Sequence, residues 1–313
     1  MEQVHILLYY KFQPIKDVEY FIRVHKRKCE ELAIVGKVLV GNEGVNGSVA
    51  GTYEQMEEYK EFFQGIEGFE DLWFKEELGN EAPFNKMIVR EKKEIVSLQK
   101  KVDMSRKGKY VNSEEFLEGV KDEDTIIIDT RNDYEYEVGK FKGAVNPNIK
   151  TFREFPEFVD KFKEKVDKDK KIFMYCTGGI RCEKASLYME DQGFTDVHQL
   201  HGGIINFRQE IPDKGWEGKC FVFDKRLVTK DSDDAEVISE CISCGETSDL
   251  QRNCKNVGCD DLVVQCAKCQ EKLHGCCREE CMYEFLEYTR ERAQKKKDGT
   301  WIAPELSNQN YLN

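Results

Sequence analysis

The segment around Cys176 has the residue types and the spacing of a nucleophilic cysteine loop. It follows an apolar run and reads Cys176, Thr177, Gly178, Gly179, Ile180, Arg181, Cys182. The thiolate is the reactive form of cysteine, and positive charge or a helix N-terminus lowers the pKa of the thiol. The two glycines let backbone N–H groups turn toward the sulfur, and Arg181 adds a fixed charge. We therefore expect Cys176 to be a catalytic nucleophile and Thr177–Cys182 to be its active-site loop.

The length of this loop limits which chemical group it can bind. Four residues separate Cys176 from Arg181, one fewer than in the Cys-x5-Arg loop of cysteine phosphatases. The shorter loop suits an added sulfur atom better than a tetrahedral phosphate. Cys182 either resolves a persulfide or disulfide on Cys176, or is a small residue in the first turn of a helix. The alternative for Cys176 itself is a buried, inert thiol.

Nine of the 13 cysteines lie between residues 241 and 281, and their spacing is that of metal ligands. They are Cys241, Cys244, Cys254, Cys259, Cys266, Cys269, Cys276, Cys277 and Cys281. Eight thiolates in knuckle pairs support two structural zinc ions with four ligands each. The pairing is either cross-braced, with Cys241, Cys244, Cys266 and Cys269 on one ion, or sequential. Whether Cys276 or Cys277 is a ligand stays open, and surplus thiols with a redox duty are the alternative to zinc.

Composition limits the class of protein. A chain of 313 residues with 40% hydrophobic and 35% charged residues predicts two or three globular domains. Clustered cysteines without a recognisable leader or a long apolar run predict a cytoplasmic protein without a membrane partner. The net charge of −12 argues against a protein that coats nucleic acid.

The elements that position these cysteines fall into three predicted domains. Residues 1–95 predict an α+β ferredoxin-like domain in the order β-α-β-β-α-β. Its strands are expected at 4–10, 36–40, 48–53 and in 72–76 and 86–90, its helices at 17–33 and 54–63. A connection at 41–47, rich in Gly and Asn, joins the middle strands.

Residues 105–212 predict a parallel-sheet α/β domain. Its strands are expected at 125–129, 171–175 and 197–200, with helices at 152–165 and 181–193 and one that begins after Asn112. Residues 213–313 predict a small, zinc-stapled region with a helical tail.

A basic segment, residues 86–109, joins the first two domains. It holds nine Lys/Arg and three Asp/Glu, so its net charge is 9 − 3 = +6. It is either a solvated linker or a contact for an anionic partner such as RNA.

Three motifs give the second domain a resemblance to the rhodanese family. Besides the loop at Cys176, they are Asp129-Thr-Arg131 with Gly139–Ala144, and Leu200-His-Gly-Gly-Ile-Ile-Asn-Phe207. Further motifs are Lys37–Val40, Glu43–Gly51 and the segment from Asn253 through Cys259 to Cys269. In this order the motifs resemble the tRNA uridine hydroxylase family, to about residue 285. That family joins an acylphosphatase-like domain, a rhodanese domain and a rhodanese-associated C-terminal region.

The resemblance implies oxygen-dependent 5-hydroxylation of the wobble uridine, position 34, of tRNA, with Cys176 in the place of the rhodanese nucleophile. The implied partners are the anticodon region of tRNA, molecular oxygen and an electron donor that the sequence does not identify. No flavin, nicotinamide or iron motif is evident. The alternatives are a persulfide sulfurtransferase, fed by thiosulfate or a carrier protein, and a non-catalytic RNA-binding protein.

Overall fold

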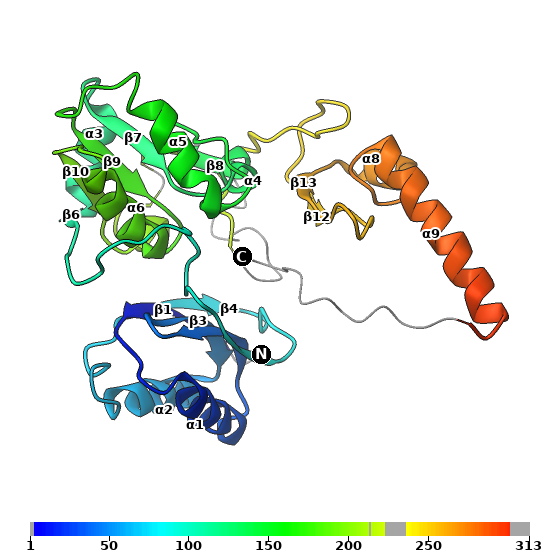
Figure 1. The fold of residues 1–313 in the computed structure, drawn as a ribbon, viewed down its shortest axis with the longest axis horizontal. Helices are drawn as coiled ribbons and strands as arrows, with labels where there is room; N and C mark the ends of the chain where they lie inside the picture. Colours follow the sequence, from blue (N-terminus) through cyan, green and yellow to red (C-terminus); the bar gives the residue numbers. More distant parts are fainter. Residues whose placement is uncertain (1–2, 213, 223–235, 301–313) are drawn as a thin grey trace. The chain divides into compact units, whose positions relative to one another are not determined.

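The computed structural model describes residues 3–212, 214–222 and 236–300. By contacts the chain forms two compact units (Figure 1). The first contains the chain up to Asn132 and the segment Gly143–Gly215, and the second contains Asp133–Lys142, Trp216–Phe221 and the cysteine-rich segment. The parts of the predicted C-terminal region at 223–235 and 301–313 lie outside the described residues. Among the described helices, none has the length and apolar character needed to cross a lipid bilayer.

The N-terminal part of the first unit is a five-stranded sheet with two helices on one face (Figure 1). The strand order is β4-β1-β3-β2-β5. The core between sheet and helices is rich in aromatic rings, among them Tyr9, Tyr59 and Phe63. The elements are β1 Val4–Phe12, α1 Val18–Glu31, β2 Val35–Gly41, β3 Gly44–Gly51, α2 Tyr53–Gln64, β4 Phe74–Gly79 and β5 Met87–Glu91.

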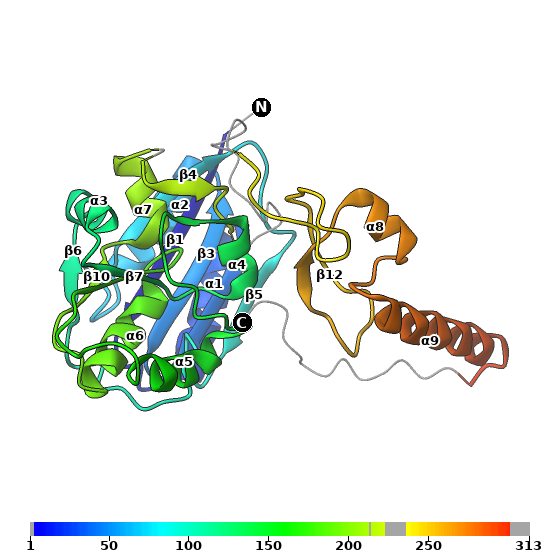
Figure 2. The ribbon, with the colours of Figure 1, turned by 90° about the horizontal axis from the view of Figure 1, so that it is seen from above.

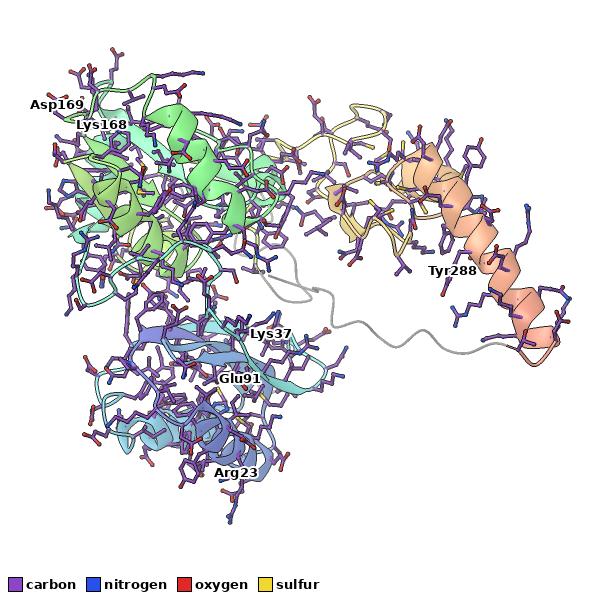
Figure 3. The ribbon with its side chains drawn as sticks, viewed as in Figure 1. Arg23, Lys37, Glu91, Lys168, Asp169 and Tyr288 are labelled. Carbon is purple, nitrogen blue, oxygen red and sulfur yellow. The ribbon has the colours of Figure 1, made fainter. Side chains whose placement is uncertain are left out.

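Two details of this sheet differ from the prediction. The segments expected to supply one last strand form two strands at opposite edges. β4 pairs antiparallel with β1, and β5 pairs parallel with β2. Lys37 of β2 and Glu91 of β5 mark these neighbouring strands in Figure 3. The predicted connection 41–47 is wrong in its length, because β3 already begins at Gly44 and only Asn42 and Glu43 form the turn.

The second half of the first unit is a four-stranded parallel sheet in the order β6-β10-β9-β7. Its strands are β6 Lys109–Val111, β7 Ile126–Asp129, β9 Ile172–Tyr175 and β10 Val197–Leu200. Sequence reasoning missed β6, which has three residues and lies at the sheet edge. Helices cover both faces (Figure 2). They are α3 Ser113–Lys121, α5 Phe155–Phe162, α6 Ile180–Asp191 and α7 Gly203–Glu210.

The two faces of this sheet bury different side chains. On one face Val159 of α5 and Met189 of α6 join Met174 of β9 in one apolar cluster. On the other, Phe116 of α3 packs against Phe173 and Phe207. The expected helix at 152–165 is shorter than predicted, since a 3-10 turn, η1 Phe152–Glu154, precedes α5.

The basic segment between the two sheets is anchored by its apolar residues. Ile95 and Leu98 are buried, and Leu98 belongs to the core of the parallel-sheet domain. Glu43 accepts a hydrogen bond from the Ile95 N–H at 2.7 Å. The buried Lys184 of α6 donates to Glu94 at 2.7 Å and to the Val96 carbonyl at 3.0 Å. The segment is therefore packed along part of its length.

The second unit is built from short elements. α4 Asp133–Val138 precedes β8 Gly139–Phe141, which pairs antiparallel with β11 Trp216–Gly218. In the cysteine-rich segment β12 Gln251–Asn253 pairs antiparallel with β13 Leu262–Val264. Two helices follow, α8 Ala267–Lys272 and α9 Glu279–Lys297, the latter carrying Tyr288 (Figure 3).

Candidate active site and metal centres

Cys176 directly follows β9 and is fully buried, at the point where the loop turns into α6. Its sulfur accepts a hydrogen bond from the Gly179 N–H at 3.1 Å. Gly179 has φ +102°, a conformation that residues with a Cβ rarely adopt. The glycine therefore makes the turn that aims its N–H at the sulfur.

The surroundings of Cys176 favour its thiolate. Burial raises the pKa of the thiol, because a low-polarity environment disfavours charge. The hydrogen bond from Cys182, the charge of Arg181 and the N–H groups of Arg181 and Cys182 outweigh this and lower the pKa to about 5. Burial and the neighbouring thiolate raise the pKa of Cys182 well above its usual value. Of the two thiols, Cys176 is therefore the one whose charged form is favoured.

Two neighbouring motifs hold the loop in place. Thr130 donates to the Tyr175 carbonyl at 3.0 Å, and its hydroxyl lies 3.5 Å from the Cys182 sulfur. On the other side, the N–H groups of Ile204 and Ile205 donate to the carbonyls of Cys176 and Thr177 at 3.0 and 3.1 Å. These backbone contacts fix the position of the loop.

Among the remaining loop residues, Arg181 supports the loop and Gly178 borders open space. Arg181 is buried, and its guanidinium donates to the Thr177 hydroxyl at 3.3 Å. Ile180 begins α6. At Gly178, by contrast, an added Cβ would meet nothing within 4 Å. Space beside the loop is therefore open at Gly178.

Three side chains of the N-terminal domain lie around this loop, and sequence reasoning missed all of them. The Tyr10 hydroxyl donates to Glu183 at 2.8 Å, and a Cβ added at Gly179 would lie 2.8 Å from the same hydroxyl. The buried Lys75 has its ammonium 4.9 Å from the centre of the Tyr10 ring and 4.5 Å from that of Trp73. No spacing links these residues to Cys176, because they lie some 100 residues or more before it in the sequence.

Lys75 carries its charge within reach of the thiolate. Burial lowers the pKa of its ammonium to about 8, and the negative charges of Cys176 and Glu183 act in the opposite direction. A buried ammonium is costly unless negative charge compensates it. The N-terminal sheet thus contributes a cation to the electrostatics of the loop.

The cysteine-rich segment brings eight of its nine thiols together in two sets of four. The sets are Cys241, Cys244, Cys266, Cys269 and Cys254, Cys259, Cys277, Cys281, with the sulfur atoms of each within 4.8 Å of one another. Both sets combine cysteines distant in sequence, which is the cross-braced arrangement. Cys276 is buried beside the second set and is not part of it.

The sulfur spacing fits a tetrahedral metal. A zinc ion bound to four thiolates at ~2.3 Å holds the sulfur atoms about 3.8 Å apart. Cys244 and Cys266 are 3.8 Å apart, and Cys277 lies 3.7 Å from both Cys259 and Cys281. These separations far exceed the ~2.05 Å of a disulfide. Each set could hold one metal ion with no ligand position left for a substrate.

Comparison with known proteins defines the class first. Three family models match: the UPF0176 acylphosphatase like domain at residues 4–95, the Rhodanese-like domain at 112–210 and the Rhodanase C-terminal at 217–282. The chain is a rhodanese-fold protein with an acylphosphatase-like N-terminal domain and a cysteine-rich C-terminal region. A solved rhodanese-like domain from Anabaena sp. is 20% identical, with a TM-score of 0.31, and covers 42% of this chain and 92% of that one.

Relatives that match most of the chain then identify its family. A protein of Enterococcus faecalis is 43% identical over 282 residues, which cover 88% of this chain and 89% of the relative. A protein of Streptococcus gordonii is 40% identical, with 90% and 88% covered, and one of Bacillus licheniformis is 41% identical, with 88% of each covered. All three are named tRNA uridine(34) hydroxylase. The chain belongs to the tRNA uridine(34) hydroxylase family.

Proposed function

We propose that this protein is an oxidoreductase that hydroxylates carbon 5 of uridine 34 in tRNA, using molecular oxygen and the thiolate of Cys176. The observation that carries the proposal is the cysteine loop, with the Gly179 N–H directed at the Cys176 sulfur, in a chain that belongs to this family. A buried thiol with a pKa of about 5 is charged at neutral pH and is a ready nucleophile. The loop residues Thr177–Cys182 would support it, and Arg181 and Gly179 do so most directly.

The thiolate would act by covalent addition to the uracil ring. Its sulfur bonds to C6, and the electron pair of the C5–C6 double bond moves onto C5 and O4. Carbon 5 then bonds one atom of dioxygen, while two electrons and two protons from an external donor reduce the other atom to water. Loss of the C5 proton and expulsion of the thiolate restore the double bond and free the enzyme. The transient C–S bond makes C5 nucleophilic, which explains a need for cysteine.

The rest of the chain would serve binding and stability. The basic segment 86–109 and the N-terminal sheet would contact the anticodon region of tRNA, and this substrate would place the protein in the cytoplasm. The two four-cysteine sets would hold one structural zinc ion each. Zinc bound there would restrain the short elements of the C-terminal region, which has few large apolar residues to bury.

The test replaces Cys176 in a strain that lacks the endogenous gene. Cys176→Ser is expected to abolish 5-hydroxyuridine derivatives in tRNA, measured by nucleoside mass spectrometry. Cys220→Ser is the matched control: this thiol is also buried, but it lies in the second unit, outside the catalytic loop, where it donates to the Phe221 carbonyl at 3.6 Å. It should leave hydroxylation unchanged. Unaltered hydroxylation by Cys176→Ser would overturn the proposed step.

A persulfide sulfurtransferase remains the second candidate, and the proximity of two thiols favours it. Cys182 lies within hydrogen-bond reach of the Cys176 thiolate and is placed to resolve a persulfide. In that case the deletion strain would lose a thiolated nucleoside and keep its hydroxylated ones. The same mass spectra therefore separate the two functions.

A further inference from the structure

We propose that Trp73, His201 and Tyr110 form a stacking platform for an unpaired nucleobase of the anticodon loop, next to the loop of Cys176. The proposal rests on the proposed tRNA function and adds a binding site to it. It assigns to the N-terminal sheet a direct part in recognising the substrate. The platform combines residues from three places in the chain: Trp73 directly before β4, Tyr110 of β6 and His201 in the turn after β10.

The rings form a preassembled stack. Trp73 and His201 are parallel within 4°, with ring centres 4.8 Å apart. Tyr110 meets His201 edge to face at 5.5 Å and an angle of 83°. The exposed parts of these rings offer a flat base an aromatic surface that is already assembled, so little ordering entropy is lost on binding.

These rings are exposed although they are large. Trp73 keeps 42% and Tyr110 keeps 43% of its surface in contact with solvent, and His201 is exposed as well. Exposed aromatic rings that gather in one place are a mark of binding surfaces. Proteins recognise unpaired RNA bases by stacking them on side chains of this kind.

The platform adjoins the catalytic loop. A Cβ added at Gly202 would lie 2.7 Å from the Trp73 ring, and one added at Gly203 would lie 2.6 Å from the Cys176 carbonyl. Two consecutive glycines thus separate the platform from the loop. A base on the platform and a uridine over Cys176 would belong to the same short stretch of RNA.

The charge around the platform suits a polyanion. The Lys75 ammonium lies over the Trp73 ring at 4.5 Å and steadies it by a cation–π contact. Lys107 of the basic segment is close enough to affect the ionisation of Asp71, two residues before Trp73. Phosphates that flank a stacked base would meet Lys107, whereas the buried Lys75 acts through its contact with the Trp73 ring.

The test measures binding, so it does not depend on catalysis. A fluorescent anticodon stem–loop RNA is titrated with each variant, and the affinity is read from anisotropy. Trp73→Ala is expected to weaken binding by roughly 10- to 100-fold, the usual loss when one base–aromatic stack is removed. Trp73→Phe, which keeps a flat ring, should recover most of the affinity. Tyr20→Ala is the matched control, because Tyr20 is a 55% exposed aromatic residue on α1.

A second set of RNAs identifies which nucleotide of the anticodon loop stacks on the platform. Abasic nucleotides placed one at a time through the anticodon loop should include a position at which wild type and Trp73→Ala bind equally. Equal affinity of Trp73→Ala and Tyr20→Ala, or no such abasic position, would overturn the platform. The alkylation rate of Cys176 must be unchanged in Trp73→Ala; a changed rate would mean a distorted loop and would also overturn it. If Cys176→Ser binds the RNA normally and still hydroxylates tRNA, the proposed cysteine step fails while the platform stands.

Discussion

Cys176 and Cys182 are chemically different thiols although they lie only six residues apart, one before and one in the first turn of α6. Both are fully buried, and burial raises the pKa of each. Cys176 receives the N–H groups at the start of α6 and the charge of Arg181, whereas Cys182 faces the thiolate that results. Of two close sulfur atoms, the one with more stabilising contacts to its charged form is the one whose thiolate is favoured. The reactivity of the site thus depends on a few polar contacts.

The first prediction concerns Arg181. A cation beside the thiolate favours the charged form, so Arg181→Met should raise the pKa of Cys176 from about 5 by roughly one unit. Below this pKa the thiol is protonated and unreactive. The measurement is the pH dependence of methanethiosulfonate modification at Cys176, followed by peptide mass spectrometry.

The control for Arg181 is Lys121→Met, because Lys121 pairs with Glu118 on the surface of α3 and both side chains are more than half exposed. Its replacement should not change the pH midpoint of the modification at Cys176. A wild-type midpoint near 9, the ordinary value for a thiol, would contradict the stabilised thiolate.

At the scale of elements, the turn between β2 and β3 connects the first sheet to the basic segment. Glu43 in this turn accepts from the Ile95 N–H at 2.7 Å and pairs with Lys184 of α6 at 2.9 Å. Lys184 is only 4% exposed and also pairs with Glu94 at 2.7 Å. The position of the turn therefore bears on the placement of α6, the helix that follows the catalytic loop.

The second prediction tests whether the turn between β2 and β3 tolerates a side chain at Gly44. Gly44 has φ +145°, and a Cβ there would lie 1.9 Å from the Lys11 carbonyl oxygen. Backbone must shift to relieve such an overlap, so Gly44→Ala should reduce the free energy of unfolding by more than ~2 kcal/mol. Urea denaturation monitored by circular dichroism gives the value.

Gly65→Ala is the matched control, since its φ of −81° suits alanine and an added Cβ would have only ordinary contacts, the nearest at 3.6 Å. Its effect should stay within about 0.5 kcal/mol, helped by the smaller entropy of the unfolded alanine chain. Equal effects of the two substitutions would show that the turn is not a tight structural requirement.

At the scale of the whole molecule, charge and cysteines are unevenly distributed along the chain. The net charge of −12 includes a basic segment of net +6 that begins at β5 and ends at β6. The nine clustered cysteines lie in the second unit, and eight of them form two sets of four. The first unit contains the thiolate loop, and the second contains the sets that fit structural metal ions.

The third prediction concerns the number of zinc ions that the chain binds. The purified wild-type protein should contain about two zinc ions per chain, measured by inductively coupled plasma mass spectrometry. Cys277→Ser removes one ligand of the second set and should leave about one ion. Cys276→Ser, one residue away and outside the set, should retain both. Fewer than one ion in the wild-type protein, or equal losses in the two variants, would contradict the assignment.

The sequence by itself determined the features that depend on neighbouring residues. A buried strand, a glycine turn and a helix start within ten residues specify the loop of Cys176, because backbone geometry fixes how such a short segment folds. The same holds for the two-layer character of the N-terminal domain and for the parallel sheet, whose short apolar strands β7 and β9 are recognisable. The three domain limits and the ligand roles of the nine cysteines stay predictions.

Only the tertiary structure decided which distant residues meet. Local sequence cannot distinguish Cys276 from Cys277, because the chain direction at that point decides which sulfur faces Cys254 and Cys259. Nor does any pattern place Trp73 and Lys75 beside a loop that lies about a hundred residues further along. Such contacts arise when separate apolar faces pack together, and their positions depend on the whole fold. The residues that stabilise the Cys176 thiolate therefore lie in one short segment, whereas the distant residues beside this segment are brought there by the fold of the whole chain.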